Sequence, residues 1–435
     1  MVEEKLENNE ITDNSLRILK GKGADKASVT ILDSEKHELY VENGKINLLR
    51  TTCDTSIELI AFKNNQRGSV IINDKDKISI ENATAQVMEN AVSSKEDDAN
   101  DIAAYQESKN FDSSNPGPDY EKMYDRLKDF LQYTSGNFPL LKIQAIELFY
   151  TSKQKWFKNS NGVNYSEKSG FYEFFIFYYS KKDEKISSAN FTSVSMKNLE
   201  KKLHEYGNIR QLLIQSVEQL DVKPLPGKFT GDIIITPECM NAFVNYFTSP
   251  LQNIPVIRKT SFFQGKLDKT VASPEFSLST CPESSELARK HYLTKDGYCT
   301  ENTHIIKDGI LKSFILDLYG SRKTGKKRCG SDGNCYVIDP GNKSYDDIIK
   351  PTKKGLLLSR FSGGMPAANG DFSGVAKNSY YIEDGKITYP VSETMISGNL
   401  EEMLVNINSI SKETTNTGNY IFPWISFSGI VVSGK

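Results

Sequence analysis

Three segments near the C-terminal end of the chain decide its fold: Asn369-Gly370-Asp371-Phe372-Ser373-Gly374, Tyr381 to Val391, and Ser397-Gly398-Asn399-Leu400. Glycines separate short apolar runs here, which is typical of short strands joined by tight turns. The pair Asp384-Gly385 predicts a two-residue hairpin, because such a turn requires positive φ values. A helix is expected from Asn399 to Ile410. The end of the chain is therefore predicted to be β-rich.

The composition of the 435-residue chain, with 38% hydrophobic and 25% charged residues, is that of a globular protein. This length predicts two or three domains. A formal net charge of −2 provides no basic excess for nucleic acid or an anionic membrane, so neither partner is expected. Met1 to Glu10 is acidic and polar, so no signal peptide is expected. No apolar run is long enough for a membrane span, and six cysteines are too few for a disulfide scaffold. We therefore expect a cytoplasmic protein with reduced thiols.

The first 112 residues predict an N-terminal α+β domain. Alternating apolar residues flank Asn43-Gly44, which is a strong hairpin signal. Two further strands are expected from Ser56 to Phe62 and from Gly68 to Ile72. Apolar residues then recur at helical spacing, so an amphipathic helix from Asp76 to Ser94 should pack on this sheet.

A run of prolines and small polar residues at 113–118 predicts a domain boundary. Residues 119–222 should form a middle α+β segment packed against the first domain. Two long β-rich stretches are expected from Lys142 to Lys158 and from Phe171 to Tyr179, followed by a helix from Met196 to Leu220. The second stretch is rich in Phe and Tyr, which favours a buried strand over an exposed platform for stacking peptides or bases.

Residues 228–435 predict a β-rich C-terminal domain of mostly antiparallel strands with a few helices, so the whole chain is expected to be α+β. The domain should begin with a strand at Asp232 to Ile235 and a helix from Pro237 to Phe247, whose Thr-Pro-Glu start is typical of a helix N-terminus. A strand pair should turn at Asp308-Gly309. A loop rich in Gly, Lys and Arg is expected from Gly320 to Gly333.

Several histidines and cysteines are candidate metal ligands, but each group departs from known spacing. His204-Glu205 is half of the zinc motif H-E-x-x-H, because Asn208 stands where the second histidine is required and Ile209 after it is not a histidine either. An ordinary helix residue is the simpler interpretation of His204. Two further groups lack the close spacing of zinc sites: Cys281, His291, Cys299 and His304, and the pair Cys329 and Cys335.

Charged residues also give no firm site. The basic cluster Arg322, Lys323, Lys326, Lys327 and Arg328 contains no phosphate-binding motif, so a solvated loop is favoured over a phosphate site. No G-x-S-x-G marks a serine nucleophile. Carboxylates for acid–base catalysis are present without any fixed mutual distance, at Glu283, Glu286, Asp332, Asp346 and Asp347.

The chain resembles the TldD/PmbA family of peptidase-related proteins along nearly its whole length. The N-terminal likeness runs from Glu38 through Arg67-Gly68 to Ala91. The C-terminal likeness is more specific. Besides the segments quoted first, it contains in the family's order Gly231 to Glu238, Asp296-Gly297 with Thr300, Asp308-Gly309-Ile310-Leu311 and Ser321-Arg322-Lys323.

The family that the chain resembles has two branches. In the TldD-like branch, a helix early in the C-terminal domain carries H-E-x-x-x-H, and a late cysteine completes a zinc site. In the PmbA-like, or TldE-like, branch these ligands are missing, and the protein pairs with a TldD-like subunit. Here the helix from Pro237 to Phe247 contains no histidine, and the tail from Ser411 to Lys435 contains no cysteine. The chain therefore resembles the PmbA/TldE-like branch.

This resemblance implies a zinc-free subunit of a cytoplasmic metallopeptidase complex that shapes a chamber and holds an unstructured peptide, with zinc on a TldD-like partner subunit. No catalytic residue, metal ligand or cofactor is expected in this chain. The candidates for substrate contact are Gly370, Asp371, Phe372 and Ser373, although Asp371 and Ser373 also suit turn and capping roles.

Two alternatives remain open at this point. One is a self-sufficient (metallo)peptidase with a non-standard site, using Cys281, His291 and Cys299. The other is a non-enzymatic binding protein that forms a homodimer, in keeping with the family's label of DNA gyrase modulator. A homodimer is also an alternative assembly of the subunit when its partner is absent.

Overall fold

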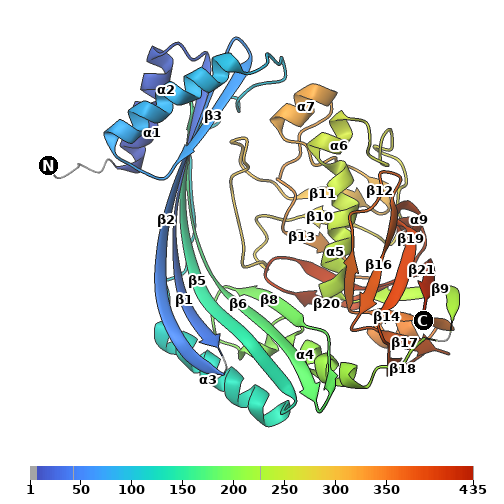
Figure 1. The fold of residues 1–435 in the computed structure, drawn as a ribbon. Coiled ribbons are helices and arrows are strands. Elements are labelled where there is room, and N and C mark those ends of the chain that lie inside the picture. The colour runs from blue at the N-terminus through green and yellow to red at the C-terminus, as the bar shows by residue number, and fades with distance from the viewer. Residues whose placement is uncertain (1–6, 43, 226, 435) are drawn as a thin grey trace.

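The computed structural model describes residues 7–42, 44–225 and 227–434. Two β-sheets organise the molecule (Figure 1). The N-terminal half forms a long, strongly curved sheet, and the C-terminal half lies on the concave side of that curve. The α+β architecture predicted from the sequence is confirmed.

The N-terminal sheet has eight strands in the order β3-β2-β1-β5-β6-β4, with β7 and β8 also paired to β6. Strand β1 is antiparallel to β2 and to β5 along most of its length. Residues on both sides of 113–118 therefore share one continuous sheet. Its strands are β1 (Lys26–Glu42), β2 (Lys45–Lys63), β3 (Gln66–Ile72), β4 (Lys109–Ser113), β5 (Leu141–Asn159), β6 (Asn164–Lys182), β7 (Lys185–Ile186) and β8 (Asn190–Met196).

Tight turns join the long strands of this sheet, and the sequence predicts the first of them. Strands β1 and β2 flank the Asn43-Gly44 turn, in which Gly44 has a φ of +75° and Asn43 lies outside the described residues. Asn64 and Asn65 between β2 and β3 also have positive φ, and so does Gly162 between β5 and β6. Asparagine and glycine are the residues that adopt this left-handed conformation most readily.

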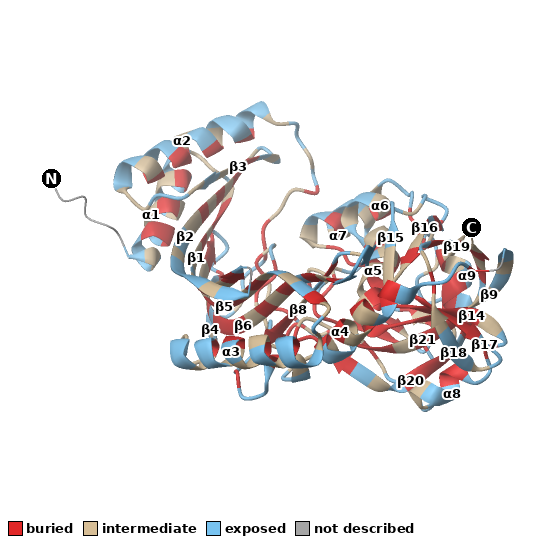
Figure 2. Ribbon diagram, turned by 60° about the horizontal axis from the view of Figure 1, so that its bottom comes forward, coloured by how far each residue is buried: buried red, intermediate tan, exposed pale blue. Residues whose placement is uncertain are grey.

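Helices pack at the two ends of the curved sheet: α1 and α2 at one end, α3 and α4 at the other (Figure 1). Figure 2 shows that they carry buried residues on one side and exposed residues on the other. The predicted start of α2 is confirmed, because the carboxylate of Asp76 accepts a hydrogen bond from the backbone N–H of Ser79 at 2.9 Å. These helices are α1 (Asn8–Gly21), α2 (Lys77–Ser93), α3 (Tyr120–Asn137) and α4 (Ile209–Glu218).

The aromatic strand β6 is buried on one face, as predicted. Tyr172, Phe174 and Tyr178 alternate along it and are at most 5% exposed. They pack in a cluster that includes residues of α3 and α4. The opposite face is more open, and Phe177 on that face is 36% exposed.

The helix predicted from Met196 to Leu220 is wrong over its first half. Met196 ends strand β8, and α4 begins only at Ile209, after the single turn η1 (Leu203–Glu205). Leu199 and Leu203 have helical spacing, but they are buried because an irregular segment carries them into the cluster with α3. Gly207, with a φ of +54°, turns the chain before α4.

The C-terminal sheet has thirteen strands, and β21 (Ile421–Ser433) lies at its centre. Strand β21 pairs with β9, β13, β19 and β20. Most neighbours are antiparallel, as predicted, and among the described strands of this sheet only the pairs β13–β21 and β9–β14 are parallel. The other strands are β9 (Lys228–Ile235), β10 (Leu278–Thr280), β11 (Thr303–Lys307), β12 (Ile310–Leu311), β13 (Tyr336–Ile338), β14 (Lys354–Leu358), β15 (Arg360–Gly363), β16 (Asp371–Lys377), β17 (Tyr380–Glu383), β18 (Lys386–Pro390), β19 (Thr394–Asn399) and β20 (Ile407–Asn416).

Helix α5 (Pro237–Thr248) is the main helix of the C-terminal half and begins with proline as predicted. Its inner face, including Met240, Phe243 and Phe247, is fully buried in the largest hydrophobic cluster. No helix in the described parts of the chain is both long and apolar enough to pass through a membrane. The shorter helical elements here are η2 (Gln219–Asp221), η3 (Ser249–Leu251), α6 (Asn253–Ile257), α7 (Leu318–Thr324), α8 (Tyr345–Ile349) and α9 (Leu400–Val405).

The predicted hairpins at Asp308-Gly309 and Asp384-Gly385 are confirmed, and all four residues have positive φ. The loop predicted from Gly320 to Gly333 begins instead inside α7, because Asp317 caps that helix by accepting from the N–H of Gly320 at 2.8 Å. The helix predicted from Asn399 to Ile410 ends at Val405. Ile407 leaves it because this residue pairs with β21 at the start of β20.

Candidate functional site

A cavity of about 700 Å³ lies between the concave face of the N-terminal sheet and the C-terminal half. This volume is in the range of small-molecule and peptide pockets. One wall comes from β5, β6 and β8, and the opposite wall comes from α5 and three loops of the C-terminal half. The lining residues discussed below are Lys153, Lys155, Glu167, Phe191, Thr192, Ser193, Glu238, Asn241, Asn245, Lys290, His291 and Cys335.

Helix α5 contributes Glu238, Asn241 and Asn245 to this cavity. Spacings of three and four residues place them on one face of the helix. Burial raises the pKa of the Glu238 carboxyl, and its Oε1 has no hydrogen-bond partner in the described structure. This carboxylate is therefore held in an environment that favours its neutral form.

The side chains that α5 presents do not fit a zinc ion. Structural and catalytic zinc sites use imidazole, thiolate and carboxylate ligands, whereas Asn241 and Asn245 offer amides beside the single carboxylate of Glu238. Within residues 7–42, 44–225 and 227–434, no three His, Cys, Asp or Glu side chains are arranged to hold a metal ion.

His291 and Cys335 meet in the wall opposite β5. The Nδ1 atom of His291 lies 3.8 Å from the Sγ of Cys335, and this thiol donates to the backbone carbonyl of Arg289 at 3.1 Å. Burial lowers the pKa of His291 to about 4 and raises the pKa of Cys335 to about 12. Imidazole and thiol are thus both neutral near pH 7, unlike the charged pair that activates a cysteine nucleophile.

Of the remaining histidine and cysteine candidates, Cys281 adjoins Cys335, and the others have contacts elsewhere in the fold. Cys281 donates its backbone N–H to the carbonyl of Cys335. Cys299 packs in the small apolar cluster around Tyr165, and the Nδ1 of His304 lies 2.8 Å from the Oγ of Ser279. His204 is on the single turn η1, where its ring stacks on Tyr133 with the centroids 3.7 Å apart. Cys329 is buried.

The prediction that the basic residues from Arg322 to Arg328 form a solvated loop is wrong for Arg322 and Lys323. Arg322 and Lys323 lie on α7 and form ion pairs with Asp101 and Asp97 at 2.9 and 2.7 Å. The hydroxyl of Tyr319 also donates to Asp97 at 2.9 Å. These contacts join the C-terminal half to the segment after α2. Sequence reasoning missed the two aspartates because only the fold brings them to α7.

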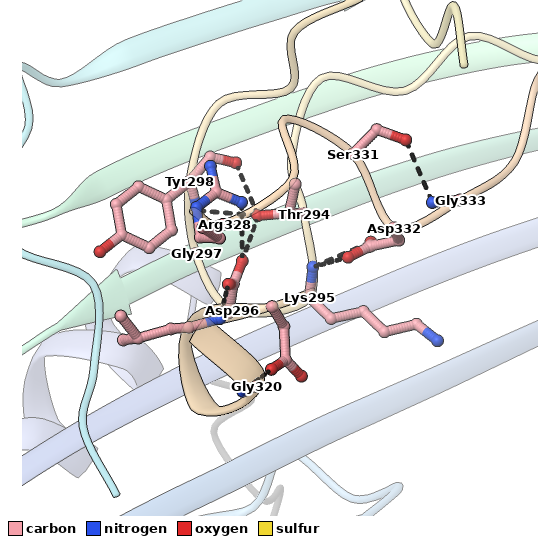
Figure 3. Close-up of polar contacts among 12 residues, drawn as sticks. Thr294, Lys295, Asp296, Gly297, Tyr298, Gly320, Arg328, Ser331, Asp332 and Gly333 are labelled. Atoms are coloured by element: carbon pink, nitrogen blue, oxygen red, sulfur yellow. Dashed lines mark hydrogen bonds and ion pairs between the residues drawn. The ribbon is translucent and has the colours of Figure 1, made fainter. Parts of the chain in front are cut away.

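A second polar cluster fixes the turn from Thr294 to Tyr298 (Figure 3). The carboxylate of Asp296 accepts from the N–H of Leu318 at 2.7 Å and lies 3.6 Å from Arg328. Asp332 accepts from the N–H of Lys295 at 3.0 Å. Burial and the nearby Asp296 raise the pKa of Asp332. Both carboxylates therefore serve local structure beside the cavity.

The other acidic candidates do not form a facing pair. Glu283 accepts from the hydroxyl of Thr300 at 3.2 Å, and Glu286 belongs to the loop after it. Asp346 and Asp347 lie in the first turn of α8. The Asp347 carboxylate pairs with Lys350 at 2.7 Å, which lowers its pKa to about 2.

The signature residues Gly370, Asp371, Phe372 and Ser373 lie at the start of β16 and do not line the cavity. The Asp371 carboxylate accepts from the side-chain amides of Asn399 and Asn369 at 2.8 and 2.7 Å, and these bonds lower its pKa. Phe372 is 5% exposed. Their contact with a substrate stays a prediction.

Sequence reasoning also missed the cavity-lining residues Lys153, Lys155 and Glu167 on the N-terminal sheet. One signal was available, because Lys153 and Lys155 alternate within a stretch that is otherwise typical of a buried strand. Alternate residues of a strand share one face, so two lysines in this pattern indicate a polar patch on the sheet.

Comparison with known proteins adds a match of residues 226–434 to the family model of the PmbA/TldA metallopeptidase C-terminal domain. Over 209 residues the chain is 30% identical to the metalloprotease PmbA homolog of Buchnera aphidicola subsp. Acyrthosiphon pisum, covering 47% of this chain and 46% of that protein. The match thus spans about half the length of this curated relative.

Solved structures resemble the whole chain. TldE from Thermococcus kodakarensis matches with a TM-score of 0.82 and 19% identity over 97% of this chain and 99% of that chain. A proposed modulator of DNA gyrase from Bacteroides thetaiotaomicron matches with a TM-score of 0.87 and 20% identity over 98% and 99%. At these identities the likeness shows a common fold.

Proposed function

The chain belongs to the PmbA/TldD family through its C-terminal domain, and from this we propose that it is a zinc-free, PmbA/TldE-like subunit of a cytoplasmic metallopeptidase complex. Its role is to form part of a chamber and to hold an unstructured peptide there. A TldD-like partner subunit supplies the metal-activated water that cleaves the peptide bond.

The observation that carries this proposal is the side-chain set of α5. This helix presents one carboxylate and two amides to the cavity, at Glu238, Asn241 and Asn245. An asparagine side chain both donates and accepts hydrogen bonds, so it suits contact with the backbone of a peptide better than coordination of zinc. Helix α5 corresponds in position to the helix that carries zinc ligands in the TldD-like branch. Its side chains in this protein are suited to substrate contact instead.

The opposite wall supplies a strand edge. Among the described strands, β8 pairs with β6 on one of its edges, and Phe191, Thr192 and Ser193 of β8 line the cavity. Farther along, the N–H of Ser195 bonds the carbonyl of Thr417 at 2.7 Å, so the free edge faces the C-terminal half. Alternate residues of a strand direct their backbone N–H groups to the same side. The N–H groups of Phe191 and Ser193 therefore point toward the same edge as that of Ser195. An extended peptide can add to such an edge through backbone bonds alone.

The alternative of a self-sufficient metallopeptidase lacks its proposed ligand set. In the described residues Cys281, His291 and Cys299 do not form a metal-holding group. A cysteine-dependent reaction finds no activated thiol at Cys335, because burial keeps that thiol protonated.

Zinc analysis tests the proposal on the purified chain. After dialysis we expect less than about 0.1 zinc ion per chain, since a site with no preformed ligand set cannot hold the metal tightly. A TldD-like family member with H-E-x-x-x-H, purified in the same way, is the positive control. Retention of about one zinc per chain by this protein would overturn the proposal.

A further inference from the structure

Two lysines on β5 stand out among the groups that line the cavity. Lys153 and Lys155 are two residues apart, so their side chains extend from the same face of the strand into the cavity. Lys153 is exposed and Lys155 is half-buried, and partial removal of water from around them lowers the pKa of both ammonium groups. Within the described residues, neither lysine forms an ion pair or a side-chain hydrogen bond.

The carboxylates nearest these lysines have other partners or lie where burial raises their pKa, and Asp332 and Glu58 attract Lys155 less than Glu167 does. Glu173 forms an ion pair with Arg289. Glu167 lies opposite Lys155 in the β5–β6 register and accepts from the N–H of Tyr292 at 3.2 Å, while burial raises its pKa. Burial also raises the pKa of Glu238 on the far wall. Lys290 adds a further cation to the lining. Four basic side chains, Lys153, Lys155, Arg289 and Lys290, thus line the cavity against two carboxylates, Glu167 and Glu238.

An unpaired ammonium group that is partly removed from water is unfavourable, and a hydrogen-bonded anion relieves this cost. Charge-assisted hydrogen bonds are about twice as strong as neutral ones. Two lysines side by side on one strand present several donors to the same anion. The cavity should therefore bind a ligand with one negative group more tightly than a neutral ligand.

We propose that Lys153 and Lys155 form a subsite that binds a carboxylate of an extended peptide. The carboxylate is either the C-terminal α-carboxylate of the peptide or the side chain of an acidic residue. This inference rests on the proposed function, because it takes the ligand to be a peptide, and it deepens that function by assigning a substrate class. The preceding residues of the peptide then extend along β8 and α5.

Fluorescence polarisation with the full chain tests this subsite without any partner subunit. The probes are a labelled hexapeptide of alanine, serine and glycine with a free C-terminus, the same peptide with a C-terminal amide, and that amide with glutamate as its last residue. We expect the free acid or the glutamate peptide to bind at least about tenfold more tightly than the plain amide. Which of the two binds identifies the source of the carboxylate.

A double variant, Lys153→Gln with Lys155→Gln, should remove this preference. Lys168→Gln is the matched control, because Lys168 is exposed and adjoins Glu167 on β6, so its side chain extends from the opposite face. The double variant should unfold at about the same temperature as the parent, since Lys153 is exposed, Lys155 is half-buried and neither side chain is paired. This second readout shows that a loss of binding is not a loss of folding.

Equal affinity for all three peptides, or an unchanged preference in the double variant, would overturn the subsite. Such a result leaves the zinc-free role intact if the chain still retains no zinc. Conversely, zinc retention would overturn the proposed function while a preference for the carboxylate peptides stands. The two failures are therefore separable.

Discussion

Replacing Gly418 with alanine is expected to lower the free energy of unfolding by about 3 kcal/mol. Gly418 has a φ of +79°, and a Cβ atom there would lie 1.9 Å from the carbonyl oxygen of Ser195 on β8. The left-handed conformation costs an alanine about 1–2 kcal/mol, and overpacking adds about 1–3 kcal/mol. The clash involves backbone, so no flexible side chain can move aside.

Backbone hydrogen bonds fix the chain on both sides of this contact. The N–H of Ser195 donates to the carbonyl of Thr417 at 2.7 Å, and the carbonyl of Gly418 accepts from Ala288 and Arg289 at 2.9 and 3.1 Å. Gly418 therefore marks a junction between the two halves of the molecule. An alanine at this position should separate β8 from the C-terminal half and disturb the cavity beside it.

Gly325→Ala is the matched control for this substitution. Gly325 has a φ of +66°, but no atom lies within 4 Å of a Cβ placed there. We expect this variant to lose only about 1 kcal/mol, from conformation alone. Urea unfolding can be followed by tryptophan fluorescence, because Trp156 lies in β5 and Trp424 in β21. Equal losses for the two variants would show that the junction contact is not tight.

Replacing Phe243 with alanine should produce a still larger loss, about 4 kcal/mol. This side chain on α5 is fully buried. Its ring centroid lies 5.3 Å from that of Phe361 and 5.6 Å from that of Phe372. The substitution leaves a cavity at the centre of the largest hydrophobic cluster, and the rings of β15 and β16 cannot fill it without moving their strands.

Phe191→Ala removes the same atoms from a side chain that is 59% exposed and provides the control. It should lose less than about 1 kcal/mol, mainly from its contact with Arg360. Urea midpoints of the two variants measure the difference. A comparable loss in both variants would mean that Phe243 does not anchor α5. The contact between Phe372 and Phe243 would then contribute little to stability.

Local sequence signals predicted the turns and helix starts well, because their cause is local. Asp308-Gly309 and Asp384-Gly385 adopt the positive φ values that these residue types favour. Pro237 begins α5 because proline suits the first helical position. Where long-range pairing competes, the same signals failed. Ile407 and Ile410 continue a helical spacing after α9, yet both pair with β21.

The candidate site was predictable only in part. The absence of histidine in α5 is plain from the sequence, and this helix carries Glu238 and Asn241. The lysines of β5 could not be placed opposite that wall, because the antiparallel pairing of β5 with β1 and β6 builds the curved sheet that positions them. Contacts between residues far apart in the chain carry no local signature.

Peptide cleavage by the reconstituted pair tests the central claim most directly. An unstructured peptide is incubated with this chain alone, with a zinc-bearing TldD-like relative alone, and with both together. A metal centre contributes several kcal/mol of transition-state stabilisation, so the pair should cleave at least about 10³-fold faster than this chain alone, and a chelator should abolish the activity. Chelator-sensitive cleavage by this chain alone, at the rate of the pair, would contradict the account.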